Sequence, residues 1–468
     1  MKYVIIGGGP TGLSLAWVLA QNNVEVTLLE KTQMLGGSWK NHWIDNKYFS
    51  ENSPRVLSGS GYCRSFLQDI GMSKNDFANI YGDLLQSNMK VFSFLRKFLV
   101  LKDFADMAFM ASIGHRVYPD DAVLQDWFDK SALSDRAKYA LRIVSITICD
   151  TPENTNLHDF FGSFGLITLQ QMKDSNKWHT IVKNKLEKLS HVKIMTNTKV
   201  TSLSLQNDTV SSVQCETHKR DSITIHGDRF ILATQSNAIC EILSSSKSEL
   251  LENNWLPKQE FRDWCSDTHY NGFGFQLHFQ EKIPMPNQWC WSCLTDWSII
   301  TLPISNWTTE FSKDPVVKTV WSCCIIDLDA VSNNTGRSAN MSSKDEVVSE
   351  AVRQLMENYS FPTPYHITTS EGLYRKNGKW LSEMTGFTRK DKQYLPMKGN
   401  TDNLFALGCF TPPTHPSIAY METAVQSSVK FLRHYHPSFK GFQNNDFSSF
   451  FENVVKISII LILMKKCS

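Results

Sequence analysis

Two short apolar runs enclose a helix-compatible stretch at the start of the chain. Residues 3–6 are apolar throughout, as in a strand buried on both faces, and residues 24–29 return to an apolar run. Between them, residues 13–20 contain neither Gly nor Pro, and the stretch is followed by the polar pair Asn22 and Asn23. This order predicts a strand, a helix and a second strand, which form a βαβ-type unit.

The pattern changes several times beyond residue 50. Residues 51–165 favour helices, and a polar loop at 333–343 leads into Ser-Lys-Asp-Glu at 343–346, which is a capping box. Behind this box the apolar residues share one helical face, namely Val347, Val348, Ala351, Val352, Leu355 and Met356. A further helix is predicted over 178–189, and strands are predicted over 191–205, 210–216, 230–234, 273–279 and 320–328.

Length and composition indicate a large folded protein. The chain has 468 residues, of which 41% are hydrophobic and 20% charged, so two or more domains are expected and a disordered chain is excluded. Lys and Arg total 48 against 46 for Asp and Glu, which predicts no nucleic-acid partner. The 11 scattered cysteines, and a start without a leader-like apolar segment, predict a cytoplasmic protein.

A glycine-rich turn joins the first strand to the first helix. Gly7, Gly9 and Gly12 follow the G-x-G-x-x-G spacing, with Pro10 and Thr11 inside it. In this context the first Gly permits a tight turn and the second lets the backbone approach a pyrophosphate. The third lets helix and strand pack closely, and the helix N-terminus offers N–H groups to phosphates. The turn therefore predicts a dinucleotide site.

Further motif residues lie just beyond the second strand. Glu30 ends that strand, where an acidic residue accepts hydrogen bonds from ribose hydroxyls, and Lys31 follows it. A second glycine pair then stands in the run Gly36, Gly37, Ser38 and Trp39. This arrangement resembles the FAD-dependent flavin amine oxidase superfamily, which includes monoamine oxidases, protoporphyrinogen oxidase and phytoene desaturases. In these families the Gly pair lets the chain run close beneath the flavin diphosphate.

The far end of the chain carries the resemblance independently. A strand over 403–407 closes on Gly408, and residues 414–425 resemble the closing motif of monoamine oxidases. In that motif a helix N-terminus abuts the flavin pyrimidine ring and stabilises its negative charge on reduction. The resemblance implies that the N–H of Met421 is the donor, and that Val200 touches the adenine through its backbone.

The resemblance implies an α/β fold with a Rossmann-like FAD-binding domain of the glutathione-reductase-like second group. A substrate domain of mixed sheet and helices would accompany it. The FAD-binding domain would be discontinuous, formed by residues 1–50, 170–250 and 395–440. The substrate domain would comprise residues 51–169 and 251–394, followed by a C-terminal tail over 441–468.

The resemblance also implies the chemistry. FAD would be bound non-covalently, since the attachment cysteine of monoamine oxidases has no clear counterpart here. It would accept a hydride at N5 from a small organic substrate, and O₂ would be the electron acceptor. Tyr420 aligns with an aromatic that walls the cavity, and Tyr394 is predicted to face the same cavity. The lysine found near N5 in many amine oxidases would fall at Gly274, which puts an amine substrate in doubt.

Other functions on the same frame stay open. These are a desaturase or protoporphyrinogen-type oxidase, a flavin-dependent mutase and a non-catalytic binding protein. No metal site is predicted, because residues at i and i+3 on a strand, such as Cys290 and Cys293, point to opposite faces.

Two apolar stretches raise the question of membrane contact. The tail over 457–464, followed by Lys465 and Lys466, is too short to span a bilayer, for which about 20 residues are needed. It predicts a docked or flexible tail, with a weak membrane contact as the alternative. Residues 91–110 are apolar with a few basic positions and predict a helix of a cap domain, with a membrane-leaning helix as the alternative.

Overall fold

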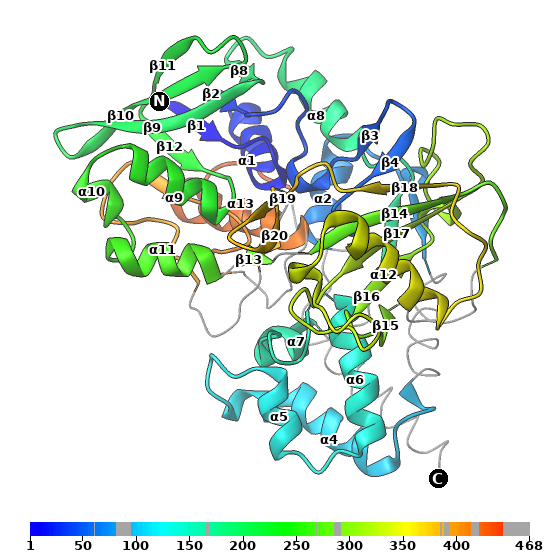
Figure 1. The fold of residues 1–468 in the computed structure, drawn as a ribbon. Helices are drawn as coiled ribbons and strands as arrows, with labels where there is room; N and C mark the ends of the chain where they lie inside the picture. Colours follow the sequence, from blue (N-terminus) through cyan, green and yellow to red (C-terminus); the bar gives the residue numbers. More distant parts are fainter. Residues whose placement is uncertain are drawn as a thin grey trace.

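The structure is a computed structural model that describes most of the chain. Figure 1 shows two lobes that contain sheets and one lobe formed by helices. The described residues are 1–59, 61–80, 95–148, 150–163, 169–267, 269–270, 272–284, 292–383, 386–387, 394–412 and 421–442.

The first lobe is built on a five-stranded sheet with strand order β22-β12-β1-β2-β8. All its pairings are parallel, although its strands come from distant parts of the chain. The strands are β1 (Lys2–Ile6), β2 (Glu25–Leu29), β8 (Val192–Met195), β12 (Arg229–Leu232) and β22 (Leu404–Ala406). The sheet therefore places strands from the start of the chain, from its middle and from residues 404–406 beside one another.

Helices cover one face of this sheet, and a second sheet with further helices covers the other. Tyr3 and Ile5 of β1 point into a core with α1 (Pro10–Gln21), α2 (Tyr62–Asp69), α8 (Lys177–Leu186) and α13 (Met421–Tyr435). Val4 and Ile6 point into a second core on the opposite face, as the two-residue period of a strand requires. That core includes β9 (Thr198–Gln206), β10 (Thr209–Thr217), β11 (Ser222–His226), α9 (Ser236–Ser245), α10 (Glu249–Glu252) and α11 (Lys258–Asp267).

The predicted βαβ unit at the start of the chain is confirmed. The structure differs from the expected elements in where the first helix begins and in the strand expected over 191–205. The helix after the glycine turn begins at Pro10, because proline has no N–H to lose at a first helical position. The single strand expected over 191–205 is instead two strands, because Asn197 between them has a left-handed backbone with φ 52°. In addition, α2 packs into the core of the first lobe. It lies beyond residue 50, where the sequence analysis ended the first segment of the FAD-binding domain.

The second lobe is built on a sheet with strand order β15-β16-β17-β14-β18. Its strands are β15 (Ser292–Cys293), β16 (Ile299–Leu302), β17 (Thr319–Ile325), β14 (Phe273–Phe279) and β18 (His366–Thr369). The sequence predicted a mixed sheet here, but every described pairing is antiparallel. The helix α12 (Lys344–Met356) begins at the predicted capping box, in which Ser343 and Glu346 bond reciprocally. It covers one face of the sheet, although Met356, expected on that face, is exposed.

Small sheets and turns connect the lobes. They comprise β3 (His42–Ile44) with β4 (Tyr48–Ser50), β13 (His269–Tyr270) with β21 (Gly386–Phe387), β19 (Leu373–Lys376) with β20 (Lys379–Ser382), and the sheet of β5 (Leu57–Ser58), β7 (Leu169–Met172) and β6 (Phe77–Asn79). The single 3₁₀ turns are η1 (Gly37–Trp39), η2 (Lys74–Asp76), η3 (Gly114–Val117), η4 (Ile304–Asn306) and η5 (Ala339–Met341).

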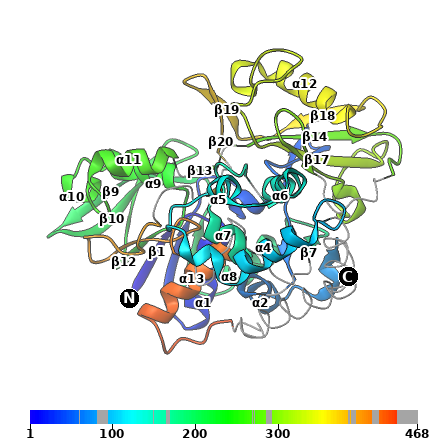
Figure 2. The ribbon, with the colours of Figure 1, turned by 90° about the horizontal axis from the view of Figure 1, so that it is seen from below.

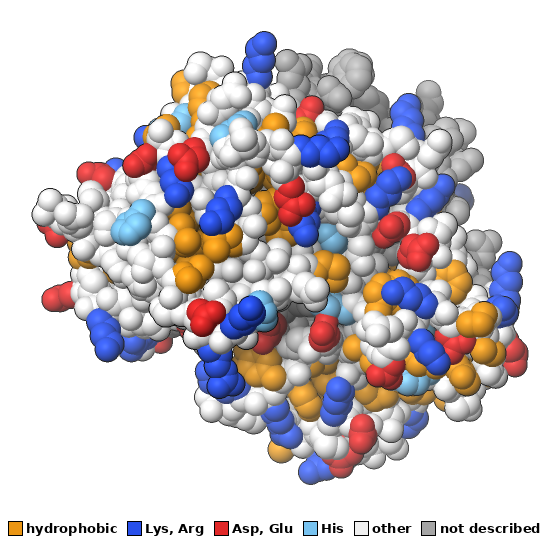
Figure 3. Space-filling model, turned by 90° about the horizontal axis from the view of Figure 1, so that it is seen from above, with side chains coloured by type: hydrophobic (Ala, Val, Ile, Leu, Met, Phe, Trp, Pro, Cys, Tyr) orange, Lys and Arg blue, Asp and Glu red, His pale blue; other side chains and the backbone are white. Residues whose placement is uncertain are grey.

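The helical lobe has its own hydrophobic core. It contains α4 (Leu101–Ser112), α5 (Leu124–Lys130), α6 (Asp135–Ile148) and α7 (Leu157–Ser163), which lie at the near side in Figure 2. None of the helices in the described part of the chain is both long and apolar enough to cross a bilayer. The opposite side of the molecule, seen in Figure 3, carries acidic and basic side chains interspersed with one another.

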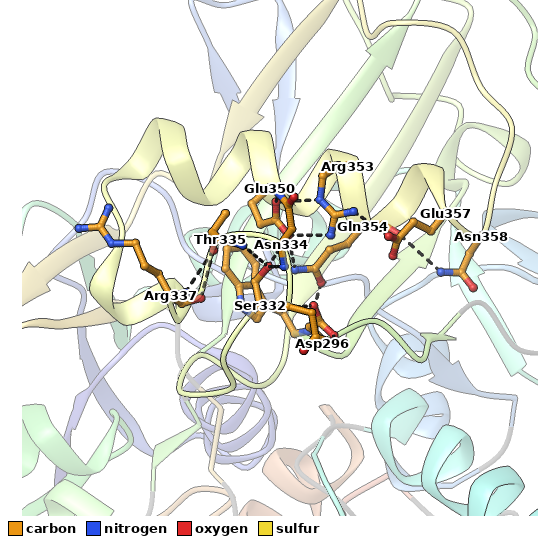
Figure 4. Close-up of polar contacts among 12 residues, drawn as sticks. Asp296, Ser332, Asn334, Thr335, Arg337, Glu350, Arg353, Gln354, Glu357 and Asn358 are labelled. Atoms are coloured by element: carbon orange, nitrogen blue, oxygen red, sulfur yellow. Dashed lines mark hydrogen bonds and ion pairs between the residues drawn. The ribbon is translucent and has the colours of Figure 1, made fainter.

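A buried carboxylate fastens the loop after β17 to α12 (Figure 4). Glu350, which is 5% exposed, accepts hydrogen bonds from Ser332 Oγ at 2.6 Å, Asn334 Nδ2 at 2.9 Å and Arg353 Nε at 2.9 Å. Burial by itself would raise the pKa of Glu350, but these donors outweigh it and hold the pKa at about 2.

We expect Glu350→Gln to lower the free energy of unfolding by about 3 kcal/mol at neutral pH. The folded-state pKa lies below the ordinary value of 4.5, so this stabilisation is complete above pH 4.5 and disappears as the pH falls to about 2. Urea unfolding of the wild type and the variant across this range measures it. Glu357→Gln is the matched control, since Glu357 binds the same Arg353 but is 59% exposed and should change stability by less than about 1 kcal/mol. A difference that stayed constant with pH would contradict the expectation.

Candidate FAD site

The glycine turn is held by backbone contacts that leave no room for side chains. The Gly7 N–H donates to Leu29 O at 2.8 Å, and the left-handed φ of Gly7 is 114°. A Cβ at Gly12 would lie 1.9 Å from Gly7 O, and one at Gly7 would lie 2.3 Å from Ala233 O. Gly7 and Gly12 are thus required for the close packing of β1, α1 and β12, as the spacing predicts.

Gly9 is different, because its position is open. A Cβ at Gly9 would meet only Gly37 Cα, at an ordinary 3.7 Å. Gly7, Gly9 and Gly37 are partly exposed, whereas their neighbours in the chain, Gly8 and Gly36, are buried. The second glycine run is fixed here by the Gly36 N–H, which donates to Gly8 O at 2.8 Å. The two glycine runs therefore form an open cradle of backbone.

The N-terminus of α1 faces this cradle and has no capping side chain. Its N-cap residue is Gly9, which makes no side-chain capping hydrogen bond, and no acidic residue lies in the first turn. The N–H groups at the start of a helix have no intrahelical acceptors, and the helix dipole favours an anion there. An open backbone cradle at such a terminus fits the diphosphate of a dinucleotide.

Glu30 lies at the end of β2 with its carboxylate turned toward the cradle. It is 7% exposed and its Oε2 accepts from the Gly8 N–H at 2.9 Å. Its Oε1 accepts from Thr32 N at 2.9 Å and from Thr32 Oγ1 at 2.8 Å. A carboxylate oxygen offers two lone pairs, so Oε2 retains capacity for a hydroxyl donor such as a ribose.

A buried lysine supports this carboxylate. No local sequence pattern identifies this lysine. Lys40 is 3% exposed, and its Nζ donates to Thr32 Oγ1 at 2.7 Å and to Met34 O at 2.9 Å. Burial lowers the pKa of Lys40, and the nearby Glu30 partly opposes this shift. Lys40 thus holds the loop after β2 against Thr32, and Thr32 in turn holds Glu30.

The segment after β4 runs between the two sheets and carries a buried ion pair. Arg55 is 9% exposed, lies 3.5 Å from Glu51 and donates to Lys40 O at 2.7 Å. Gln276 of β14 donates to Glu51 O at 2.7 Å, which ties the segment to the second lobe. Burial, with Lys40 and Arg55 nearby, lowers the pKa of His179 to about 4, so this histidine is neutral at physiological pH.

The C-terminal side of the candidate site is built by β22 and α13. The Gly408 N–H donates to Ser427 Oγ at 2.9 Å, and Met421, the first residue of α13, is fully buried. Glu422 in the same turn accepts from Tyr62 N at 3.0 Å and Cys63 N at 2.7 Å, so it links α13 to the start of α2. Sequence reasoning did not identify Glu422 as a link between the two helices.

Other predicted residues are placed as follows. The Thr11 hydroxyl donates to Ala424 O at 3.1 Å, so only its backbone N–H is available to a ligand. Lys31 Nζ pairs with Glu383 at 2.9 Å on the surface. Trp39 packs against the first core beside Ser38, and its carbonyl accepts from Trp178 Nε1 at 3.2 Å. Val200 lies on β9 in the second core of the first lobe.

The predicted cavity residues have different outcomes. The Tyr394 hydroxyl donates to Asp159 Oδ2 at 3.1 Å and so joins the closing segment to α7. Tyr420, and residues 414–420 of the closing motif with it, lie outside the described residues. A Cβ at Gly274 would lie 2.1 Å from Asn52 O, so this position has no room for a side chain such as lysine.

The cysteines described in the structure form no metal centre. Cys323 and Cys324 are buried on β17, and Cys290 lies outside the described residues. No cluster of His, Cys, Asp and Glu within the described ranges has the geometry to hold a metal ion. Cys409 follows Gly408, and burial raises the pKa of its thiol to about 12.

Comparison with known proteins identifies the first segment. Residues 5–70 match the family model of an NAD(P)-binding Rossmann-like domain. An L-amino-acid oxidase of Sistrurus catenatus edwardsii is 30% identical over 76 residues. This match covers 16% of the chain and spans only 15% of that relative.

Whole-chain similarity comes from solved structures. An oxidoreductase from Methanosarcina mazei matches with a TM-score of 0.64 at 13% identity, covering 92% of this chain and 100% of that one. Wild-type putrescine oxidase bound to putrescine matches with a TM-score of 0.58 at 12% identity, covering 93% and 99%. The chain therefore carries a Rossmann-like dinucleotide-binding unit at its start, and its overall fold is that of these two solved structures.

Proposed function

We propose that the protein is an FAD-dependent oxidoreductase that oxidises a small organic molecule and passes the electrons to O₂. The observation that carries this proposal is the open glycine cradle at the uncapped N-terminus of α1, with the Glu30 carboxylate beside it. The whole-chain likeness to putrescine oxidase supports FAD over other dinucleotides. FAD supplies a flavin ring that accepts a hydride from the substrate.

Each part of the candidate site has a distinct task in this proposal. The backbone at Gly9 and Gly37 and the N–H groups of Thr11 and Gly12 hold the diphosphate, while Glu30 binds the ribose. Val200 lines the adenine end. At the other end, Gly408 and the N–H of Met421 lie beside the flavin, where the α13 N-terminus stabilises negative charge. The buried segment from Glu51 to Arg55 excludes water between the two lobes.

Non-covalent attachment is supported by the state of the neighbouring cysteine. Cys409 is next to Gly408, but its raised pKa keeps the thiol protonated and therefore a poor nucleophile. The proposed FAD domain is assembled from residues 1–50, 170–250 and 395–440, with the remaining segments forming the substrate domain. We also propose a cytoplasmic location.

The absence of space for a side chain at Gly274 favours one alternative substrate class. A lysine at Gly274 has no room, since a Cβ there would lie 2.1 Å from Asn52 O. A desaturase or protoporphyrinogen-type oxidase, acting on a C–H bond of an apolar substrate, is therefore the second candidate. Tyr394, bonded to Asp159, would wall the cavity rather than donate to a substrate.

The visible spectrum of the purified protein tests the proposal. We expect a flavin absorption band, retained after gel filtration and released as free FAD on acid denaturation. Anaerobic addition of putrescine, other amines or L-amino acids should bleach the band if one of them is a substrate, and air should then restore it with release of peroxide. Bleaching only by apolar polyenes or porphyrinogens would favour the second candidate. A colourless protein that stayed colourless after incubation with FAD would refute the proposal.

A further inference from the structure

An apolar surface lies on the exposed side of the helical lobe. Five large hydrophobic side chains of α4 and its flanking turns are more than half exposed: Val100 at 57%, Leu101 at 56%, Phe109 at 54%, Ile113 at 57% and Val117 at 79%. Leu101 and Phe109 are eight residues apart, which places them within about 80° of each other around the helix, and Ile113 is the C-cap residue, four positions beyond Phe109. We call the five residues the α4 face.

The α4 face is not needed for the core of its own lobe. On the opposite side of the helix, Met107 and Met110 are 9% and 3% exposed and pack into the core with Trp127 and Phe128. Asp103 is 1% exposed and fixes the start of α4 by accepting from Val100 N at 3.0 Å and Ser134 N at 2.9 Å. The helix is therefore anchored by one side, and the apolar residues of the α4 face are exposed. In Figure 1, α4 lies at the lower end of the molecule.

Basic residues lie on α4 and in the segments directly before and after it. Arg96, Lys97, Lys102 and Arg116 are all exposed. Over residues 95–118 the two acidic residues contribute little opposing charge at the surface, because Asp103 is buried and Asp106 is half-buried. An apolar surface with basic residues close to it along the chain matches the two attractions that hold an interfacial helix on a membrane. These are burial of side chains among acyl chains and attraction to anionic headgroups, about 1 kcal/mol per cation.

We infer that the α4 face docks the protein peripherally on an anionic lipid bilayer. Phe109, Ile113 and Leu101 enter the boundary between headgroups and acyl chains, while Lys102 and Arg116 contact the lipid phosphates and carboxylates. A protein partner is disfavoured by the charge pattern, because the four cations close to the apolar residues would need a partner with matching acidic groups. Docking leaves the cradle of the first lobe open, since that lobe lies at the other end of the molecule (Figure 1).

Co-sedimentation of the full-length protein with vesicles tests this inference. We expect binding to vesicles of phosphatidylcholine mixed with phosphatidylserine, weaker binding to pure phosphatidylcholine, and loss of binding as salt rises. The double variant Phe109→Asp with Ile113→Asp should bind at least roughly tenfold more weakly. Lys102→Glu with Arg116→Glu should weaken binding only to the anionic vesicles.

Controls separate docking from other effects. Met341→Asp, at a 63% exposed residue of the second lobe, should bind vesicles as the wild type does. FAD content and thermal unfolding of the Phe109 and Ile113 variant should match the wild type, so a failure here is distinct from a failure of the proposed function. Binding that survived this variant but was lost on deletion of residues 457–468 would overturn the inference. A dimer in sedimentation velocity that the same variant dissociated would also overturn it, and would assign the α4 face to a second copy.

Discussion

Replacing Gly12 by alanine should destabilise the protein by about 3 kcal/mol or more, because the added Cβ would lie 1.9 Å from Gly7 O. Both groups are held by the packing of α1 on β1, so neither can move without disrupting the first lobe. Gly9→Ala should behave differently, since its Cβ meets only Gly37 Cα at 3.7 Å and the φ of Gly9 is an ordinary −82°. We expect this variant to fold with wild-type stability and to bind FAD about a hundredfold more weakly, close to 3 kcal/mol.

Urea unfolding and titration with FAD, measured on both variants, distinguish the two roles. Gly441→Ala is the control for the substitution itself, because its Cβ would be 3.9 Å from Val18, an ordinary contact. Retention of wild-type FAD affinity in Gly9→Ala would exclude a diphosphate from the cradle. Wild-type stability in Gly12→Ala would contradict the close packing of the turn.

Glu30→Gln should weaken FAD binding by about tenfold to a hundredfold, because hydrogen bonds to a charged group contribute about 1.5–3 kcal/mol. It should also lower the stability of the free protein, since Gln has one acceptor oxygen where Glu30 uses two. Truncation to alanine would leave the N–H groups of Gly8 and Thr32 without this acceptor, so the loss of FAD would come with a loss of stability.

FAD affinity is therefore measured well below the unfolding temperature of each variant. Glu25→Gln is the matched control, as Glu25 lies on the same strand, is 57% exposed and pairs with Lys2 only at 3.8 Å. It should change neither FAD affinity nor stability by a measurable amount. If Glu30→Gln lowered stability but bound FAD as tightly as the wild type, the residue would be a structural acceptor and the ribose role would be refuted.

The α4 face shows why exposure had to come from the structure. The sequence indicates an apolar helix with basic positions over 91–110, and such a stretch is compatible both with a core helix and with an interfacial one. Which side of the helix is covered depends on residues far along the chain, such as Trp127 and Ser134, that pack against α4 or bond to it.

Local patterns in the sequence determined the dinucleotide-binding unit and the capping box of α12. In both cases the interacting groups are close along the chain, so spacing alone fixes which N–H, carbonyl or carboxylate meets which. Tertiary structure decided the rest. Glu422 and Gln276 carry no local pattern, and they acquire roles because the fold brings Tyr62 and Glu51 next to them from distant parts of the chain. The close contact between Gly274 and Asn52 was also decided by tertiary structure. The two residues are far apart in the sequence, so the contact exists only once both segments are in place.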